Sequence, residues 1–80
     1  MDLDKRIEDL FREVLELDDE FVVTDQLSID DIDEWDSLTS MDLNTQLEKE
    51  FGIKFSFEEI VEMDHVGAIK KIVRGKINES

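Results

Sequence analysis

The stretch EWDSLTSMDLNTQLEKEFG, residues 34–52, contains one predicted helix with a signal at each end. Asp36 and Ser37 are residue types favoured at a helix N-terminus. Gly52 is the residue type favoured just beyond a helix C-terminus. Apolar side chains between these signals recur at helical spacing, which predicts a helix over 37–51 and favours an all-α fold.

One apolar stripe of this predicted helix suits the core of a bundle. At about 100° per residue, three apolar side chains align with Ser40: Leu43, Leu47 and Phe51. A helix in a bundle needs only one such stripe to be held in place. We therefore expect these three side chains to face the interior.

A second apolar pair, Leu38 and Met41, lies on a different side of the same helix. The residues that flank it are Asp42, Thr45 and Glu48. One interpretation is that the pair covers the far edge of a small core. The other is an exposed docking patch, with apolar anchors for affinity and carboxylates for orientation.

Three other segments carry helical signals. Residues 4–17 have apolar side chains at the spacing of one helix face, and acids near the start suit a helix N-terminus. Residues 56–63 open with a serine that has a glutamate three positions later, the capping box of a short helix. A last helix is predicted over 65–77, and Asp64 can cap it.

A long connection, residues 18–36, joins the first two predicted helices. We expect its intermittent apolar residues to pin it to the core. They are Phe21, Val22, Val23, Leu27, Ile29 and Ile32. Because no alternating pattern indicates a sheet, the chain is predicted to form one all-α domain over 1–80, a small bundle of three longer helices and one short helix.

The composition indicates a folded domain without thiol chemistry of its own. Apolar residues make up 40% of the 80 residues, more than a disordered acidic tail carries. Without cysteine there are no disulfides and no zinc–thiolate sites, so any thiol must come from a prosthetic group or a partner. The sequence shows no recognisable signal peptide, and its apolar runs are all much shorter than the ~20 residues that a membrane span needs. The cytosol is therefore the expected location.

The charge is strongly negative and unevenly spread. A formal net charge of −14 argues against direct binding of nucleic acid, because phosphates would be repelled. No lysine or arginine lies between Arg12 and Lys49, whereas the C-terminal segment is basic. The acidic interval is either a solvated surface or a landing face for basic partners, on which charge speeds encounter.

Ser37 has three candidate roles. A nucleophilic serine needs a base, but His65 is the only histidine and the Gly-x-Ser-x-Gly motif is absent, so we do not expect hydrolase chemistry. As an N-cap, Ser37 would only begin the helix. If Asp36 is the cap instead, the Ser37 hydroxyl is free to carry a phosphate ester. Unpaired N–H groups and the helix dipole favour an anion there, pointing to solvent.

The acidic residues before Ser37 do not match a calcium loop. They are Asp31, Asp33, Glu34 and Asp36. An EF-hand needs carboxylates at its first, third and fifth positions and glycine at the sixth. Counted from Asp31, the fifth position is Trp35 and the sixth is Asp36, so we expect no dedicated metal site.

The tripeptide Asp36-Ser37-Leu38 stands at the start of the second predicted helix, after a long acidic loop. Further matching positions follow along nearly the whole chain: Leu43, Leu47, Glu48, Glu50, Phe51, Gly52, Ile53, Phe57, Glu58, Glu59, Ile60 and Val66. In this combination the chain resembles the phosphopantetheine-dependent acyl carrier proteins. The tripeptide resembles the attachment motif of that family.

The resemblance implies a specific chemistry. A phosphopantetheinyl transferase would use coenzyme A to attach 4′-phosphopantetheine to Ser37, and the thiol of this arm would carry an acyl or aminoacyl group. Asp36 would help to present the serine. The chain would be a monomeric phosphoprotein without catalytic activity, serving enzymes of fatty-acid, polyketide, peptide or specialised biosynthesis.

The resemblance also implies roles for both faces of the second helix. Loading and transfer enzymes with basic docking patches would recognise Leu38, Met41, Asp42, Thr45 and Glu48. A sequestered acyl chain would lie near the core residues Leu43, Leu47 and Phe51. The rival hypothesis is an unmodified acidic adaptor that binds basic partners through the same helix.

Several positions depart from the carriers of fatty-acid synthesis, among them residues 39–42, where this chain has Thr-Ser-Met-Asp in place of an acidic residue, a small residue, Val and Glu. Those carriers usually have glycine where this chain has Glu34, and Trp35 follows it here. The sequence Trp-Asp-Ser-Leu resembles stand-alone carriers of specialised pathways, such as polyketide, peptide or surface-glycan modification. The basic C-terminal helix is a further departure.

Overall fold

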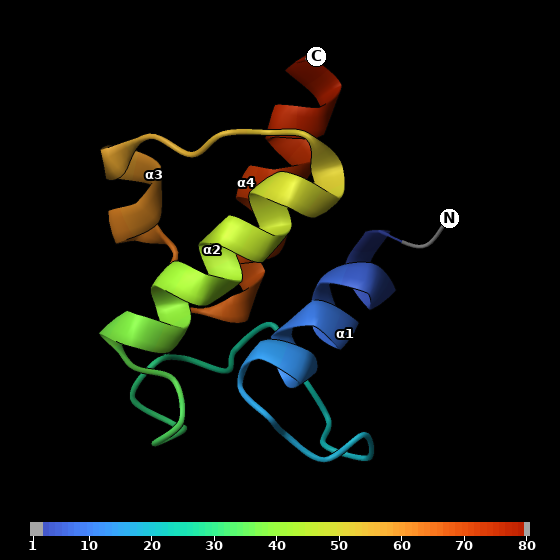
Figure 1. Ribbon diagram of the computed structural model, residues 1–80, viewed down its shortest axis with the longest axis vertical. Helices are drawn as coiled ribbons and strands as arrows, with labels where there is room; N and C mark the ends of the chain where they lie inside the picture. Colours follow the sequence, from blue (N-terminus) through green and yellow to red (C-terminus); the bar gives the residue numbers. More distant parts are fainter. Residues whose placement is uncertain (1–2, 80) are drawn as a thin grey trace.

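The computed structural model describes residues 3–79, which form four helices joined by loops (Figure 1). The helices are α1 (Leu3–Val14), α2 (Ser37–Phe51), α3 (Phe57–Glu62) and α4 (Val66–Glu79). The predicted all-α bundle of three longer helices and one short helix is confirmed. Residues 1, 2 and 80, which the predicted domain span includes, lie outside the described range.

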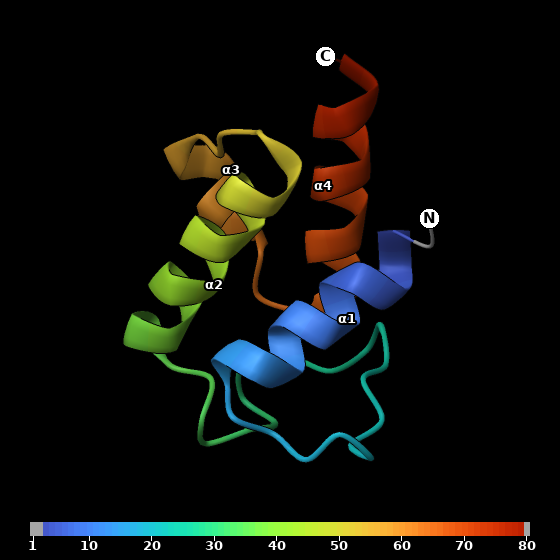
Figure 2. The same cartoon turned by 45° about the vertical axis from the view of Figure 1, so that its right-hand side comes forward.

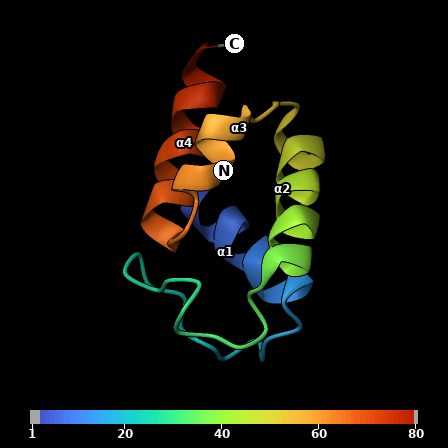
Figure 3. The ribbon, with the colours of Figure 1, turned by 90° about the vertical axis from the view of Figure 1, so that its left-hand side faces the viewer.

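The long connection closes one end of the bundle. Residues 15–36 run along the end of the molecule opposite the C-terminus of α4 in all three ribbon views (Figures 1, 2 and 3). The most deeply buried side chains come from α1, α2, α4 and the residue after α1: Ile7, Phe11, Leu15, Leu43, Leu47, Val66, Ile69 and Val73. The core therefore lies between the three longer helices.

The first helix ends earlier than predicted, at Val14 instead of residue 17. Glu16 has a φ of 56°, in the left-handed region. The N–H of Leu17 donates to the carbonyl of Arg12 at 2.8 Å, and the N–H of Glu16 donates to that of Glu13 at 3.2 Å. These two bonds form a Schellman motif, which satisfies the last carbonyls of α1 and ends the helix. The prediction was wrong because this position usually holds glycine.

Both ends of α2 are where the sequence predicts them. Asp36 is the N-cap, and Gly52 follows the last turn with a φ of 63°. The capping box of α3 is also confirmed, with Ser56 as N-cap and Glu59 as its reciprocal partner. These ends were predictable because each depends on residues within four positions of it.

The start of α4 is capped by His65 and not by Asp64. The Nδ1 atom of His65 accepts a hydrogen bond from the N–H of Ala68 at 3.1 Å. The carbonyl of His65 accepts from the N–H of Ile69 at 3.2 Å. The imidazole therefore takes the place of the expected carboxylate. Asp64 instead uses its carbonyl to accept a hydrogen bond from the N–H of Ile29 at 3.0 Å.

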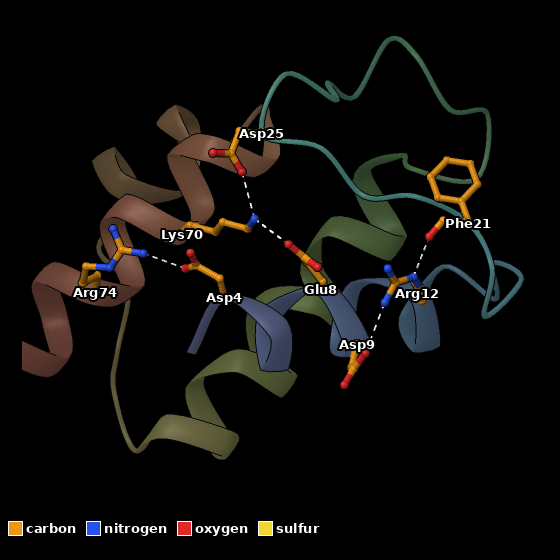
Figure 4. Close-up of polar contacts among 8 residues, drawn as sticks. All are labelled: Asp4, Glu8, Asp9, Arg12, Phe21, Asp25, Lys70 and Arg74. Carbon is orange, nitrogen blue, oxygen red and sulfur yellow. Dashed lines mark hydrogen bonds and ion pairs between the residues drawn. The ribbon is translucent and has the colours of Figure 1, made fainter. Parts of the chain in front are cut away.

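Polar contacts that the sequence analysis did not predict hold the long loop (Figure 4). Lys70 Nζ of α4 donates to Glu8 Oε2 of α1 at 2.7 Å and to Asp25 Oδ1 of the loop at 2.8 Å. Arg12 Nε donates to the carbonyl of Phe21 at 2.7 Å. Charged side chains of two helices therefore fasten the loop at both of these points.

Backbone hydrogen bonds also dock the loop on the start of α4. The N–H of Val66 donates to the carbonyl of Leu27, and the N–H of Gly67 donates to the carbonyl of Asp25, each at 2.9 Å. A Cβ atom at position 67 would lie 3.2 Å from that Asp25 oxygen. Glycine at this position therefore permits the close approach of loop and helix.

Most of the predicted apolar anchors of the loop pack against the core. Val23 and Ile32 are buried, and three others are partly buried: Phe21, Leu27 and Ile29. Val22 is 73% exposed, so its predicted anchoring is wrong. Its two neighbours, Phe21 and Val23, pack inward, which leaves the side chain between them facing solvent.

Candidate functional site

Asp36 organises the start of α2. Its Oδ1 accepts hydrogen bonds from the N–H groups of Leu38 and Thr39, both at 3.0 Å. In return, Thr39 Oγ1 accepts from the N–H of Asp36 at 2.8 Å, which completes a capping box. The hydrogen bond from the Thr39 backbone is the main reason that the pKa of Asp36 lies below its ordinary value. The cap therefore holds a charged carboxylate at this helix end at neutral pH.

Ser37 occupies the first position of α2, and its side chain is exposed. Its hydroxyl makes no hydrogen bond within the part of the chain that the structure describes, because Asp36 performs the capping. One part of the expectation is wrong: the N–H groups of Leu38 and Thr39 are already occupied by the carboxylate. A phosphate on Ser37 would therefore gain less from this helix end and would extend into solvent. The exposed hydroxyl fits such a group.

One apolar face of α2 is buried and the other is exposed, as the interpretation of Leu38 and Met41 as a docking patch requires. Leu38 is 74% exposed and Met41 is 67% exposed, so neither covers the core. Leu43 and Leu47 are buried, as expected, whereas Phe51 is only partly buried at the C-terminal end of the helix. The helix therefore presents an exposed apolar pair on its outer side.

The polar residues that flank this pair differ in their exposure and in the hydrogen bonds that they already make. Asp42 and Thr45 are exposed, although the Thr45 hydroxyl donates to the carbonyl of Met41 at 2.9 Å. Glu48 is partly buried, and its Oε2 accepts a hydrogen bond from the N–H of Phe55 at 2.8 Å. Glu48 thus supports the connection after α2 in addition to any role at the surface.

The short helix α3 adds exposed apolar side chains that the sequence analysis missed. Phe57 is 81% exposed, Val61 is 62% exposed and Ile60 is 41% exposed. The helix has only six residues, Phe57–Glu62, and its apolar side chains cannot all face one core. The three apolar residues in so short a segment were the sequence signal that could have predicted this exposure.

A cavity of about 310 Å³ begins beside Ser37 and extends between α2, α3 and α4. Its walls are mostly apolar, and its lining residues are Ile29, Trp35, Ser37, Ser40, Met41, Leu43, Asn44, Ile60, Val61, Met63, Asp64 and Ile69. Of the residues expected near a sequestered chain, Leu43 lines this cavity, but Leu47 and Phe51 do not. The cavity therefore lies nearer to Ser37 than we expected from the stripe of Leu43, Leu47 and Phe51.

Trp35, one residue before the cap, is only 3% exposed. Its ring meets the ring of Phe11 edge to face, with centroids 4.9 Å apart and planes at 84°. Such a pair is stabilising beyond the area that it buries. Through this contact, the residue that precedes the cap is fixed to α1. The start of α2 is therefore anchored on both sides of Ser37, by Trp35 before it and by the cap.

Neither a metal centre nor a membrane segment is found in residues 3–79. The His, Asp and Glu side chains described there form no group of three or more that could hold a metal ion. None of the described helices has the length and apolar character that crossing a bilayer requires.

Comparisons with known proteins point to one family. Residues 5–73 match the family described as "Phosphopantetheine attachment site". The structure is similar to the solution structure of a holo acyl carrier protein from Geobacter metallireducens, with a TM-score of 0.88 and 34% identity over 99% of this chain and 90% of that chain. It is also similar to a putative acyl carrier protein from Mycobacterium tuberculosis, with a TM-score of 0.84 and 26% identity over 92% of this chain and 97% of that chain. Comparison with curated proteins gave no match.

Proposed function

This chain belongs to the phosphopantetheine-binding family of acyl carrier proteins, and from that premise we propose that Ser37 is its attachment residue. The prosthetic group of the family is 4′-phosphopantetheine. The observation that carries the proposal is the exposed Ser37 hydroxyl, which is free because the neighbouring Asp36 caps the helix. A transferase can therefore reach the hydroxyl without opening the helix.

The prosthetic group supplies a thiol, which this cysteine-free chain lacks, and the thiol holds an acyl or aminoacyl group as a thioester. The chain's own residues provide position and not catalysis. Asp36 fixes the first turn of α2, and Trp35 fixes the residue before it. Tethering the cargo to a fixed point raises its effective concentration at each enzyme that docks.

The proposed docking face combines the outer side of α2 with part of α3. Leu38 and Met41 supply apolar anchors, and Asp42 and Thr45 lie beside them, with Glu48 as a further carboxylate. Val61 of α3 belongs to the same surface region, because it lines one cavity together with Met41. The partners are a phosphopantetheinyl transferase and loading and transfer enzymes with basic patches, which the acidic face attracts.

The cavity beside Ser37 is the proposed resting place of a short tethered chain. Its position next to the attachment residue and its apolar walls support this role. Among the core residues of α2, Leu43 is the one that would contact the chain. Leu47 and Phe51 would support the helix behind it.

The proposed setting is the cytosol, because a chain without cysteine has no need of an oxidising compartment. A monomer is the proposed state, because copies with a net charge of −14 repel one another. The pathway could be fatty-acid, polyketide, peptide or another specialised biosynthesis. Trp-Asp-Ser-Leu favours the last of these.

The test is to incubate the protein with coenzyme A and a broad-specificity phosphopantetheinyl transferase and to measure its intact mass. We expect a gain of one phosphopantetheine, no gain in Ser37→Ala, and a full gain in Ser40→Ala, a matched control from the same helix. An unchanged wild-type mass, or a gain that survives Ser37→Ala, would refute the assignment. The second outcome would place the arm elsewhere, and the first would favour the unmodified acidic adaptor.

A further inference from the structure

The cavity beside Ser37 has one charged residue in its lining, Asp64. The other polar residues of the lining are Ser37, Ser40 and Asn44, and the remaining ones are apolar. No lysine, arginine or histidine is part of this lining. The cavity therefore has a negative charge at its wall without a cation beside it to balance that charge.

The carboxylate of Asp64 is not engaged elsewhere in the described part of the chain. Asp64 is exposed, and the hydrogen bond that it makes there uses its backbone carbonyl, which accepts from the N–H of Ile29 at 3.0 Å. The helix that follows is capped by His65, so the carboxylate does not take that role either. Its charge is therefore available to a group that enters the cavity or lies at its mouth.

The surroundings of the attachment residue are negative as well. Asp36 lies directly before Ser37, and the hydrogen bond from the N–H of Thr39 lowers the pKa of its carboxyl, which is therefore charged at neutral pH. The phosphodiester of an attached arm adds a further negative charge. A tethered cargo thus moves within a region of one sign, where an ammonium is attracted and a carboxylate is repelled.

We propose that the cavity shelters acyl groups that end in an ammonium in preference to acyl groups that end in a carboxylate, and that Asp64 is the residue that determines this specificity. The inference rests on the proposed function, because the cargo must be tethered at Ser37 to reach the cavity. Ser40 and Asn44 make no side-chain hydrogen bond with the described residues, so their oxygens are further acceptors for an ammonium. The favoured class of cargo is therefore short aminoacyl groups, and the disfavoured class is thioesters of dicarboxylic acids.

The size of the cavity and the exposure of Asp64 limit the cargo and the strength of the effect. At about 310 Å³ the cavity lies at the lower end of the range of ligand pockets, so only a short chain fits. Because Asp64 is exposed, water screens its charge, and an ammonium beside it keeps part of its hydration. An exposed ion pair of this kind changes an equilibrium by about two- to fivefold.

The test loads the protein from three thioesters of coenzyme A with a phosphopantetheinyl transferase. The cargoes are of similar size: β-alanyl ends in an ammonium, malonyl ends in a carboxylate, and butyryl is uncharged. Intact mass first confirms loading, and hydroxylamine then cleaves each thioester. The cleavage rate of the matching free pantetheine thioester, divided by the rate on the carrier, gives a protection factor that is corrected for the reactivity of the cargo. We expect the factor for β-alanyl to exceed that for malonyl by about two- to fivefold at low salt and to match it near about 1 M salt.

Two variants assign the preference to its source. Asp64→Asn keeps the backbone carbonyl that binds Ile29 and removes the charge, so protection should fall for β-alanyl, rise for malonyl and stay the same for butyryl. Glu62→Gln is the matched control, because Glu62 is exposed and close in sequence but does not line the cavity, and it should keep the wild-type preference. If Asp64→Asn does not fold, the order of the three cargoes in the wild type and its dependence on salt decide the question.

Three results would overturn the inference. They are equal protection of malonyl and β-alanyl in the wild type, a preference that persists in Asp64→Asn, and an equal loss of preference in Glu62→Gln, which would attribute it to the net charge. Butyryl that is cleaved as fast on the carrier as in free pantetheine would also overturn it, because no cargo would then rest in the cavity. A failure of the proposed attachment would appear earlier, as the absence of any mass gain, and would overturn both proposals.

Discussion

Lys70 of α4 and Asp25 of the loop form an ion pair of 2.8 Å between Nζ and Oδ1. The side chain of Lys70 is only 10% exposed, and the same ammonium binds Glu8 of α1 at 2.7 Å. One cation therefore joins two helices to the loop that leads to Ser37 (Figure 4). Lys70 therefore holds the loop jointly with Arg12 and the backbone hydrogen bonds at the start of α4.

Replacing this charge should destabilise the protein. In Lys70→Met the stem of the side chain is kept, but two carboxylates lose their partner, so we expect a loss of about 1.5–3 kcal/mol in the free energy of unfolding. Lys71→Met removes the same charge from an exposed neighbouring position and should change the free energy by less than about 0.5 kcal/mol. Urea unfolding of both variants measures the difference. Equal losses would show that net charge, and not the buried pair, is responsible.

The contribution of this pair should depend on pH. The hydrogen bond from Lys70 lowers the pKa of Asp25, so its stabilisation is present above the ordinary value of about 3.9 and is lost as the pH falls through the folded value. Burial opposes the charge on Lys70, but its hydrogen bonds to Asp25 and Glu8 prevail and raise its pKa. That stabilisation is present below the ordinary value of about 10.4 and is lost as the pH rises through the folded value.

The measurement is the difference in free energy of unfolding between wild type and Lys70→Met across a pH series. We expect a plateau between about pH 5 and pH 9 and a decline below about pH 4. Comparing two proteins cancels the repulsion among the remaining acids, which also changes with pH. A difference that stays constant down to pH 2 would argue against a charged pair.

Glu16 and Gly52, which lie just beyond the C-termini of α1 and α2, provide a matched test of backbone conformation. Both residues have a positive φ, which is 56° for Glu16 and 63° for Gly52. Glu16→Gly should stabilise the protein by about 0.5–1 kcal/mol, because glycine adopts this conformation without steric cost. Gly52→Ala should destabilise it by about 1 kcal/mol, although nothing lies within 4 Å of the added Cβ atom. Thermal unfolding checks both signs, and destabilisation by Glu16→Gly would contradict the reading of this turn.

These elements show which parts of the fold the sequence can predict. The ends of α2 depend on Asp36 and Gly52, which act on backbone groups within four residues, so local residue types are sufficient. The partners of Lys70 lie 62 and 45 residues away. The chain has 23 acidic residues, and neither charge nor spacing says which two of them the folded chain brings to one lysine.

The candidate site was predictable to a similar degree. The sequence indicates Asp36 and Ser37, and helical periodicity separates the two apolar faces of α2. It left open whether Leu38 and Met41 are exposed, and the structure shows that they are. It does not indicate the cavity, which lies where α2, α3, α4 and the loop meet. A tryptophan in an acidic loop could equally have been exposed, and only packing against Phe11 decides that it is buried.

Leu47→Ala and Leu38→Ala should separate stability from docking within one helix. Leu47 is fully buried, so its truncation leaves a cavity and should cost about 2–5 kcal/mol in the free energy of unfolding. Leu38 is 74% exposed, so its truncation should change stability by less than about 0.5 kcal/mol. The rate of Ser37 modification should fall in Leu38→Ala instead. Normal kinetics in this variant would remove Leu38 from the proposed docking face.

Charge reversal at Asp42 should slow the encounter with a basic partner enzyme without unfolding the domain. Asp42 is exposed beside Leu38 on α2, so a lysine there repels the partner at the point of contact. We expect Asp42→Lys to reduce the second-order rate of Ser37 modification several-fold at low salt. The difference should disappear near about 1 M salt, where the screening length is roughly 3 Å.

Asp19→Lys, an exposed loop position with the same change of net charge, is the control. Equal slowing in both variants would mean that only the total charge of the protein matters. An unchanged rate in Asp42→Lys at low salt would show that electrostatic docking does not involve this part of α2.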